Sequence, residues 1–392
     1  MSGPSVAEDG ALAPDADSSR RGLAERSLRL ALLGSRGIPA RYGGYETLLE
    51  ELGPRLVERG HHVTVYCRSH LVPAGLEEFR GCRLVVLPTV RRKHFDTPVH
   101  TLLSTLHAGE RAYDAALLVN AANAAFVPLL RAAGIPVALH VDGIERRRAK
   151  WGAVGRGVYA LSERLAVSVA DELITDAEVI ARHYRQLYGA ATTTITYGVA
   201  ADHDPGDEVL ERLGLESGGY FLYVSRFEPE NNPHRVAAAY REVPGRTPLV
   251  MVGDAPYARP FIDGFVRGAD PRILFPGGVY GRHYRQLQHH ALAYVHATEV
   301  GGTHPALVEA MGYGNCVVVN ETPENREVAG DAGLYFEAAR PETLSRLLAR
   351  VLDDPELCAE QGRRAAARAE ERYSWDRITR QYDEVFRRLA RV

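Results

Sequence analysis

The feature of this 392-residue sequence that most restricts its fold is a regular alternation of short apolar runs with longer stretches of helical periodicity. In one such stretch, Leu48, Leu52 and Leu56 recur at helical spacing. The apolar runs are expected to be buried strands, and they lie at 28–33, 62–67, 84–87, 115–119, 136–140, 172–175 and 194–197. Strands that alternate with helices predict a parallel sheet with helices on both faces.

The same alternation starts again after a segment rich in Asp, Gly and Pro, with apolar runs at 220–224, 248–252, 272–275, 291–295 and 316–319. We therefore predict an α/β protein of two doubly wound, Rossmann-like domains that face a central cleft. The predicted parts are a disordered tail at 1–27, a first domain at 28–200, a linker at 201–218, a second domain at 219–372 and a helix at 373–392 that crosses back to the first domain.

Charge and composition exclude several classes of protein. The formal net charge is −3, so there is no basic excess of the kind that nucleic-acid binding requires. No apolar run reaches the roughly 18 residues that a membrane helix needs, and the first 27 residues lack the apolar centre of a signal peptide. The four cysteines form no C-x-x-C pair, so we predict no metal site. The sequence predicts a cytoplasmic protein.

Ligands of doubly wound domains bind beyond the carboxyl ends of the strands, so we looked for candidate residues there. Gly43 and Gly44 precede a predicted helix, where bare backbone and free N–H groups attract an anion; a plain tight turn is the alternative. The spacing of these glycines and of Gly34 and Gly37 does not fit G-x-G-x-x-G, which argues against an NAD enzyme.

His140 and Asp142 close a strand of the first half, at the predicted edge of the cleft. His140 is a candidate donor to a sugar hydroxyl or a phosphate, and Asp142 is a candidate to take a proton or to orient an acceptor. The alternative for His140 is a histidine held by backbone groups at a turn.

Arg226 follows the first strand of the second half. Its fork of donors suits a diphosphate, and the alternative is a structural ion pair with Glu228 or Glu230.

The stretch 299–310 carries the richest pattern. Thr303 is a candidate helix cap, and Gly301 and Gly302 would bare the amides at the helix start for a phosphate. Glu309 lies inside that helix beside small residues, where a carboxylate needs a partner such as the paired hydroxyls of a ribose. A solvated helix face is the alternative.

Taken together, these motifs resemble family 4 of the retaining, nucleotide-sugar-dependent glycosyltransferases. The resemblance covers roughly residues 28–390 and implies the GT-B architecture of two Rossmann-like domains. Further segments resemble a bacterial rhamnosyltransferase-like subgroup of cell-surface polysaccharide pathways. The motifs are Gly43-Gly44, 225–227 and 301–310 for the family, and 34–47, 141–145 with Lys150-Trp151, and 228–232 for the subgroup.

The resemblance implies a role for each matching residue. Gly44 would present its amide to the donor diphosphate, and Arg226 would neutralise that diphosphate as it leaves. Glu309 would hold the nucleotide ribose as the second Glu of a paired-glutamate motif, and His140 would lie near the transferred sugar.

Two positions depart from the family pattern. Asn231 stands where the family often has a lysine, and Gly301 stands where the first glutamate is expected. Glu299 is the candidate to replace that glutamate. The predicted catalytic residues are His140, Asp142, Arg226 and Glu299, and the predicted donor-binding residues are Gly43, Gly44, Arg226, Asn231, Gly301, Gly302, Thr303 and Glu309.

The resemblance implies a hexosyl transferase that moves a sugar, with rhamnose as one candidate, from a nucleotide-diphosphate donor to a glycan or glycolipid acceptor in bacterial polysaccharide or glycoconjugate biosynthesis. The nucleotide sugar is a substrate, no other cofactor is implied, and no matching loop carries a D-x-D metal pair. The alternatives are a GT-B sugar-nucleotide epimerase, a phosphorylase and a non-catalytic nucleotide-sugar-binding partner.

Two basic runs, 91–94 and 146–148 with Lys150, suit a contact with an anionic membrane surface at the inner face of the plasma membrane. Ordinary solvated charge is the alternative.

Overall fold

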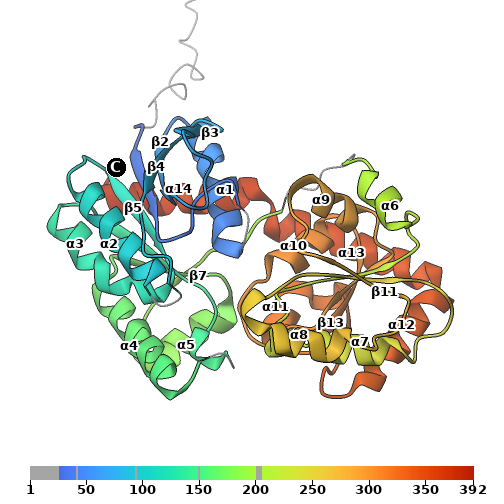
Figure 1. The fold of residues 1–392 in the computed structure, drawn as a ribbon. Coiled ribbons are helices and arrows are strands. Elements are labelled where there is room, and N and C mark those ends of the chain that lie inside the picture. The colour runs from blue at the N-terminus through green and yellow to red at the C-terminus, as the bar shows by residue number, and fades with distance from the viewer. Residues whose placement is uncertain (1–25, 41–42, 93–94, 149–150, 200–204) are drawn as a thin grey trace, which may run out of the picture.

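The computed structural model describes residues 26–40, 43–92, 95–148, 151–199 and 205–392 as two α/β domains side by side (Figure 1). Most of the predicted tail, residues 41–42, Lys93, His94, Lys150 and 201–204 of the predicted linker lie outside the described residues. No helix in the described ranges combines the length and the apolar character that crossing a membrane requires.

The first domain is built on a sheet of eight strands in the order β3-β4-β2-β1-β5-β6-β7-β8. All neighbouring strands are parallel except β3 and β4. The central strands are apolar along their length because helices cover both faces. The strands are β1 Arg29–Leu33, β2 His62–Arg68, β3 Glu78–Phe79, β4 Cys82–Leu87, β5 Ala115–Val119, β6 Val137–Val141, β7 Glu172–Thr175 and β8 Thr193–Thr194.

The sheet of the first domain separates two buried clusters, and helices cover both of its faces. Side chains of α1 belong to one cluster, and those of η2, α3, α4 and α5 belong to the other. The helical segments are α1 Gly44–Glu58, α2 Asp96–Gly109, η2 Ala121–Phe126, α3 Val127–Ala132, η3 Glu145–Arg147, α4 Ala153–Val169 and α5 Glu178–Tyr188.

The second domain is built on a parallel sheet of six strands in the order β11-β10-β9-β12-β13-β14. Its strands are β9 Phe221–Val224, β10 Leu249–Val252, β11 Ile273–Gly277, β12 Ala293–His296, β13 Cys316–Asn320 and β14 Gly333–Phe336. Its helical segments are α6 Glu208–Leu213, η4 Pro229–Asn231, α7 Pro233–Tyr240, η5 Pro256–Ala258, α8 Arg259–Val266, α9 Gly281–His289, α10 Pro305–Gly312, α11 Pro323–Ala329, η6 Gly330–Ala332, α12 Pro341–Asp353 and α13 Pro355–Tyr373.

The last helix, α14 (Trp375–Ala390), returns to the first domain and lies against α1, β5 and β6 (Figure 1). Trp375, Tyr382 and Phe386 are buried in the core cluster of that domain. Asp383 accepts hydrogen bonds from Arg59 at 2.9 Å and Arg387 at 2.8 Å. The end of the chain is therefore part of the first domain as much as of the second.

The structure confirms the α/β architecture with two Rossmann-like domains but corrects the predicted linker at 201–218. Residues 208–213 form α6, which packs against α9 of the second domain. Val209 and Leu210 are buried in the core of that domain. The Asp and Gly residues around them drew the linker prediction, but the apolar pair decides the fold because its burial is favourable.

Candidate active site

A cavity of about 400 Å³ separates the two domains at the carboxyl ends of their strands. Residues of both domains line it, among them Tyr197, Val224, Gly253, Tyr280 and Trp375. The cavity brings together seven of the predicted residues: Gly43, Gly44, Asp142, Arg226, Asn231, Thr303 and Glu309. Four others, His140, Glu299, Gly301 and Gly302, do not line it.

The first turns of α1 and α10 meet across this cavity. A Cβ atom on Gly44 would lie 3.2 Å from the Tyr197 hydroxyl oxygen and 3.3 Å from Cγ of Pro305. The two domains approach so closely here that a side chain at Gly44 would push against both. Gly43 makes no side-chain cap hydrogen bond at the start of α1, and Gly43, Gly44 and Thr47 line the cavity.

Arg226 follows β9 and points toward the cavity with its side chain one-third exposed. Its Nη2 atom lies 3.6 Å from Oε2 of Glu228, whose side chain is almost fully buried. The ion pair that was the alternative to a donor-binding role is therefore present. It does not exclude that role, because the guanidinium still lines the cavity.

Asn231 holds the loop that carries Arg226. Its side-chain amide donates to the carbonyl oxygen of Arg226 at 2.7 Å, and its own carbonyl accepts from the Tyr223 hydroxyl at 2.6 Å. A lysine at this position would bring a charge to the cavity, whereas the asparagine brings a backbone clamp. The departure from the family pattern therefore exchanges charge for loop order.

Glu309 lies on α10 with its carboxylate at the cavity. The Tyr284 hydroxyl donates to Oε2 of Glu309, and the side-chain amide of Gln288 donates to the Tyr284 oxygen at 2.9 Å. Burial raises the pKa of Glu309. The chain of hydrogen bonds orients this carboxylate, which supports its predicted interaction with hydroxyl groups.

Thr303 joins the two domains and does not cap α10. Its amide donates to Oδ2 of Asp176 at 2.9 Å, and its hydroxyl donates to the Asp176 carbonyl at 2.6 Å. A Cβ atom on Gly302 would lie only 2.1 Å from Oδ1 of Asp176, so only glycine fits there. The predicted capping role of Thr303 is wrong because His304 occupies the N-cap position of α10 and no side-chain cap hydrogen bond is formed there.

Gly301 is packed between the domains as well. A Cβ atom on Gly301 would lie 2.3 Å from Cε1 of His304, and one on Gly143 would lie 2.6 Å from the Gly301 Cα atom. A glutamate at position 301 therefore has no room for its side chain in this arrangement. The backbone of Gly301 and Gly302 packs against Gly143 and Asp176 of the first domain, and these two glycines do not line the cavity.

Asp142 and Asp176 form a carboxyl pair at the first-domain wall. Burial, and then the nearby Asp142 charge, raises the pKa of Asp176 well above its ordinary value. A negative charge close to a buried carboxyl group favours the protonated form of that group, because adjacent negative charges repel. The amide of Asp142 also donates to the Tyr45 hydroxyl at 2.9 Å, which fixes the loop.

His140 lies beneath the cavity and has no exposed surface. Its Nδ1 atom is 3.0 Å from the Tyr382 hydroxyl of α14, and Nε2 has no hydrogen-bond partner among the described residues. Burial lowers the pKa of His140 to about 4, so the ring is neutral at pH 7. The predicted contact between His140 and the transferred sugar finds no support in this position, and a side chain holds the ring where the alternative expected backbone.

Glu299 lies outside the cavity, with 42% of its side chain exposed. Its Oε1 atom accepts from the Asn232 amide at 3.0 Å and lies 3.4 Å from Nη1 of Arg235. The structure therefore does not place Glu299 where a substitute for the missing first glutamate would have to lie. The backbone amide of Glu299 donates to the Glu230 carbonyl oxygen at 2.9 Å.

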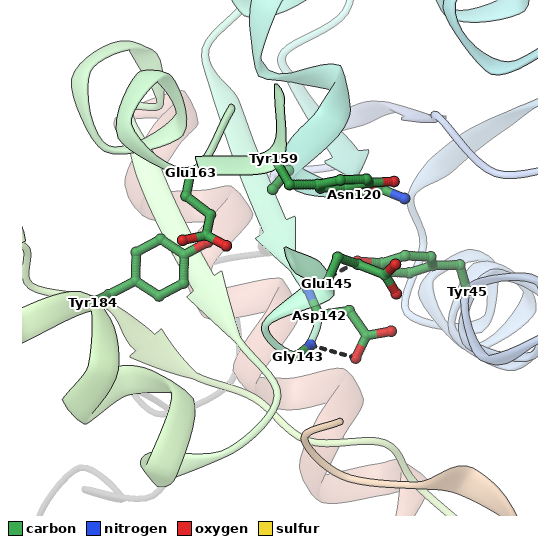
Figure 2. Close-up of a pocket in the computed structure, with 9 residues that line it drawn as sticks. Tyr45, Asn120, Asp142, Gly143, Glu145, Tyr159, Glu163 and Tyr184 are labelled. Atoms are coloured by element: carbon green, nitrogen blue, oxygen red, sulfur yellow. Dashed lines mark hydrogen bonds between the residues drawn. The ribbon is translucent and has the colours of Figure 1, made fainter. Parts of the chain in front are cut away.

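A second, smaller pocket of about 20 Å³ lies in the first domain, next to the cavity. Asp142 lines both, and Figure 2 shows it at one edge of the pocket with its carboxylate bonded to the Gly143 amide at 2.7 Å. Tyrosines and carboxylates make up most of the remaining wall: Tyr45, Tyr159, Tyr184, Glu145 and Glu163, with Asn120 and Ala121. This polar pocket is on the side of the cavity opposite Arg226 and Glu309.

Two arginines of the predicted basic run, Arg146 and Arg148, pair with glutamates instead of forming a solvated face. Arg146 Nε lies 3.3 Å from Glu163 Oε2, and Arg148 Nε lies 2.6 Å from Glu145 Oε1. The Arg148 side chain is 8% exposed and lines the interdomain cavity. Charge counting along the sequence could not distinguish this inward arginine from surface arginines.

Sequence reasoning missed Arg148, Asp176 and Tyr284 as site residues. A signal for Asp176 was available, since it directly follows β7 just as Asp142 follows β6. Tyr284 lies on α9 and reaches Glu309 only through the packing of two helices, so no local pattern points to it.

Comparison with known proteins gives the geometry a family. The family described as "Glycosyl transferase 4-like domain" matches residues 43–198, and the family described as "Glycosyl transferases group 1" matches residues 208–368. The two matches take in most of both domains and leave only the ends and the connection uncovered. The chain belongs to the family 4-type glycosyltransferases.

This glycosyltransferase is also similar to a curated protein, the O-antigen chain mannosyltransferase B of Escherichia coli. The two are 27% identical over 187 residues, which is 46% of this chain and 49% of the relative. The match thus spans about half the length of that relative.

Solved structures show the same architecture. Sucrose-phosphate synthase from Thermosynechococcus elongatus has a TM-score of 0.79 at 20% identity, covering 93% of this glycosyltransferase and 99% of that chain. Anabaena HepE in complex with UDP-glucose has a TM-score of 0.75 at 18% identity, covering 91% and 98%. At these identities the likeness concerns the fold, which is the GT-B fold for this glycosyltransferase.

Proposed function

We propose that this glycosyltransferase transfers a sugar from a nucleoside-diphosphate donor to an acceptor hydroxyl, with retention of configuration at the anomeric carbon. One observation carries the proposal: a single interdomain cavity holds Arg226, the oriented carboxylate of Glu309 and the first turn of α1. These are a cation, a hydroxyl acceptor and a set of amides, and a nucleotide sugar needs all three. The complexes of HepE with UDP and UDP-glucose support this choice of donor class.

The donor is placed with its diphosphate at Arg226 and its ribose at Glu309. As the bond between the sugar and the phosphate breaks, negative charge grows on the leaving diphosphate and positive charge grows at C1. Arg226 and the amide of Gly44 stabilise the leaving group, a contribution of the kind that electrostatic positioning makes in enzymes. Metal independence is part of the proposal, and unchanged turnover in the presence of EDTA is its test.

The acceptor is placed at the first-domain wall, beside Asp142 and the small polar pocket. Its hydroxyl attacks C1 from the face that the diphosphate leaves, and the departing phosphate oxygen takes the hydroxyl proton. Asp142, which lines both the cavity and the small pocket, orients that hydroxyl by hydrogen bonding. In this scheme the chain supplies position and charge and forms no covalent intermediate.

The sugar and the acceptor are proposed from kinship. Mannose, from the E. coli relative, and rhamnose, from the resemblance to the rhamnosyltransferase-like subgroup, are the candidate sugars. A glycan or lipid-linked acceptor of surface polysaccharide synthesis fits both.

The decisive experiment incubates the purified chain with UDP-, GDP- and dTDP-sugars and measures nucleotide release with and without a glycan acceptor. A transferase releases the nucleotide slowly without acceptor and faster with it. An epimerase changes the sugar without accumulating transfer product, and a non-catalytic binder releases no nucleotide. Either of the last two outcomes would overturn the proposal.

Contact with an anionic membrane surface is proposed for α4. Val154, Val158 and Leu161 recur at one-turn spacing on this helix and are 83%, 56% and 68% exposed. Arg164 is exposed one turn further along the same helix. Sedimentation with vesicles containing anionic lipid tests the idea: the Leu161→Asp variant should stay in the supernatant while wild type sediments, and equal sedimentation of both would refute the role of α4.

A further inference from the structure

Arg148 enters the cavity from the first domain and faces the same carboxylate as Arg226 of the second domain. Nη1 of Arg148 lies 3.8 Å from Oε2 of Glu228, and Nη2 of Arg226 lies 3.6 Å from that same oxygen. Both arginines line the cavity. The two domains thus contribute one guanidinium each to a single anionic position.

The surroundings of Arg148 direct it to this position. Its Nε side lies 2.6 Å from Oε1 of Glu145, and its side chain is 8% exposed. Burying an arginine is costly unless anions balance the charge, so a buried guanidinium at a cavity wall indicates a place for negative charge.

His304, at the start of α10, lines the same cavity as both cations. This residue directly precedes Pro305 and lines the cavity. Burial chiefly, then His296, Arg148 and Arg226, hold the pKa of His304 well below its usual range. The two arginines therefore act on the same point, at the amino end of a helix whose dipole also favours an anion.

Asn231 brings no charge to the second-domain loop that carries Arg226. Asn231 stands where the family pattern often has lysine, and its amide holds the Arg226 loop. Arg285 of α9 also lines the cavity, and its charge acts on Glu309. Arg148 is the cation that shares the Glu228 position with Arg226.

We propose that Arg148 is the second diphosphate-binding cation of this enzyme, supplied across the cleft by the acceptor-side domain. The inference rests on the proposed function and adds a binding residue to it. When the donor is absent, Glu228 lies near both guanidinium groups, and Glu145 also pairs with Arg148. When the donor is bound, its diphosphate lies between Arg148 and Arg226, so nucleotide binding ties the two domains together.

The test compares Arg148→Gln and Arg148→Lys with wild type, and uses Arg146→Gln as the matched control. Arg146 lies two residues away, pairs with Glu163 and does not line the cavity. Calorimetry measures the affinity of each protein for UDP, GDP and dTDP, and then, for the diphosphate that wild type binds best, for the matching nucleoside. Thermal melting checks that each variant is folded, and Arg148→Met replaces Arg148→Gln if the latter does not fold.

We expect Arg148→Gln to weaken diphosphate binding about tenfold or more, since it removes one charge-assisted contact. Arg148→Lys should recover most of that loss, Arg146→Gln should match wild type, and nucleoside affinity should be equal in all four proteins. Unchanged diphosphate affinity in Arg148→Gln overturns the inference and leaves the proposed function standing. Equal losses for diphosphate and nucleoside also overturn it, because they indicate a structural role. If wild type binds no nucleoside diphosphate, the proposed function and the inference fall together.

Discussion

The two walls of the interdomain cavity differ in how their residues are held. On the second-domain wall, Arg226 and Asn231 lie on one strand–loop segment, and Glu309 lies on α10. The first-domain wall includes Asp142, and the buried residues Asp176 and His140 next to it are held by partners far away in the sequence, Thr303 and Tyr382. The difference shows that a local motif can place a binding group, whereas a group shared between domains owes its place to the closed fold.

The largest expected effect is a loss of activity when residues of the second-domain wall are replaced. Replacing Arg226 or Glu309 with alanine should lower kcat about 30- to 1000-fold, because losing one such electrostatic contact costs about 2–4 kcal/mol in the barrier. Steady-state kinetics with the preferred donor measures the loss, and thermal melting checks the fold. Rates near wild type in either variant would show that the second-domain wall does not bind the donor in this way.

The next largest effect concerns stability. The His140→Ala change should lower the free energy of unfolding by about 2 kcal/mol, because it empties buried space and leaves the Tyr382 hydroxyl without its partner. Urea unfolding measures this, with Tyr382→Phe as a companion variant that should lose about 1 kcal/mol. A stable His140→Ala protein with little turnover would instead restore His140 as a substrate contact.

A third effect depends on pH. The folded-state pKa of Asp176 is raised above its unfolded value, so the folded protein binds this proton more tightly and loses stability as pH rises between the two values. Asp176→Asn imitates the protonated form and removes the dependence. Relative to wild type, the variant should therefore gain stability with rising pH, by at most about 1.4 kcal/mol per pH unit.

Urea unfolding of both proteins at pH 5 and pH 8 measures the difference. A stability gap between wild type and Asp176→Asn that is the same at both pH values would mean that Asp176 does not change its protonation on folding in this range. That result would contradict the raised pKa of Asp176 in the folded protein.

The smallest effect is expected at Glu299. Because its exposed side chain contacts Asn232 and Arg235 outside the cavity, Glu299→Ala should change kcat and the donor KM by no more than about twofold. Donor kinetics beside Arg226→Ala provide the contrast within one domain. A loss comparable to that of Arg226→Ala would place Glu299 in the donor site after all.

The sequence by itself determined the α/β architecture and several of the residues that line the interdomain cavity. Strand runs and helical periodicity come from burial, which repeats along each element, and Gly44, Arg226 and Glu309 follow from rules about strand ends and helix starts. Those signals are local, so they can be read without knowing what lies across the cleft.

Only the tertiary structure decided which polar groups face the cavity and which face each other. Arg148 turned inward from a run of arginines, Thr303 bound Asp176 where a helix cap was predicted, and Glu299 lay outside. The physical reason is that hydrogen bonds and ion pairs between distant segments depend on angstrom-scale distances set by the packing of two domains and by the return of α14. No periodicity in the chain encodes those distances.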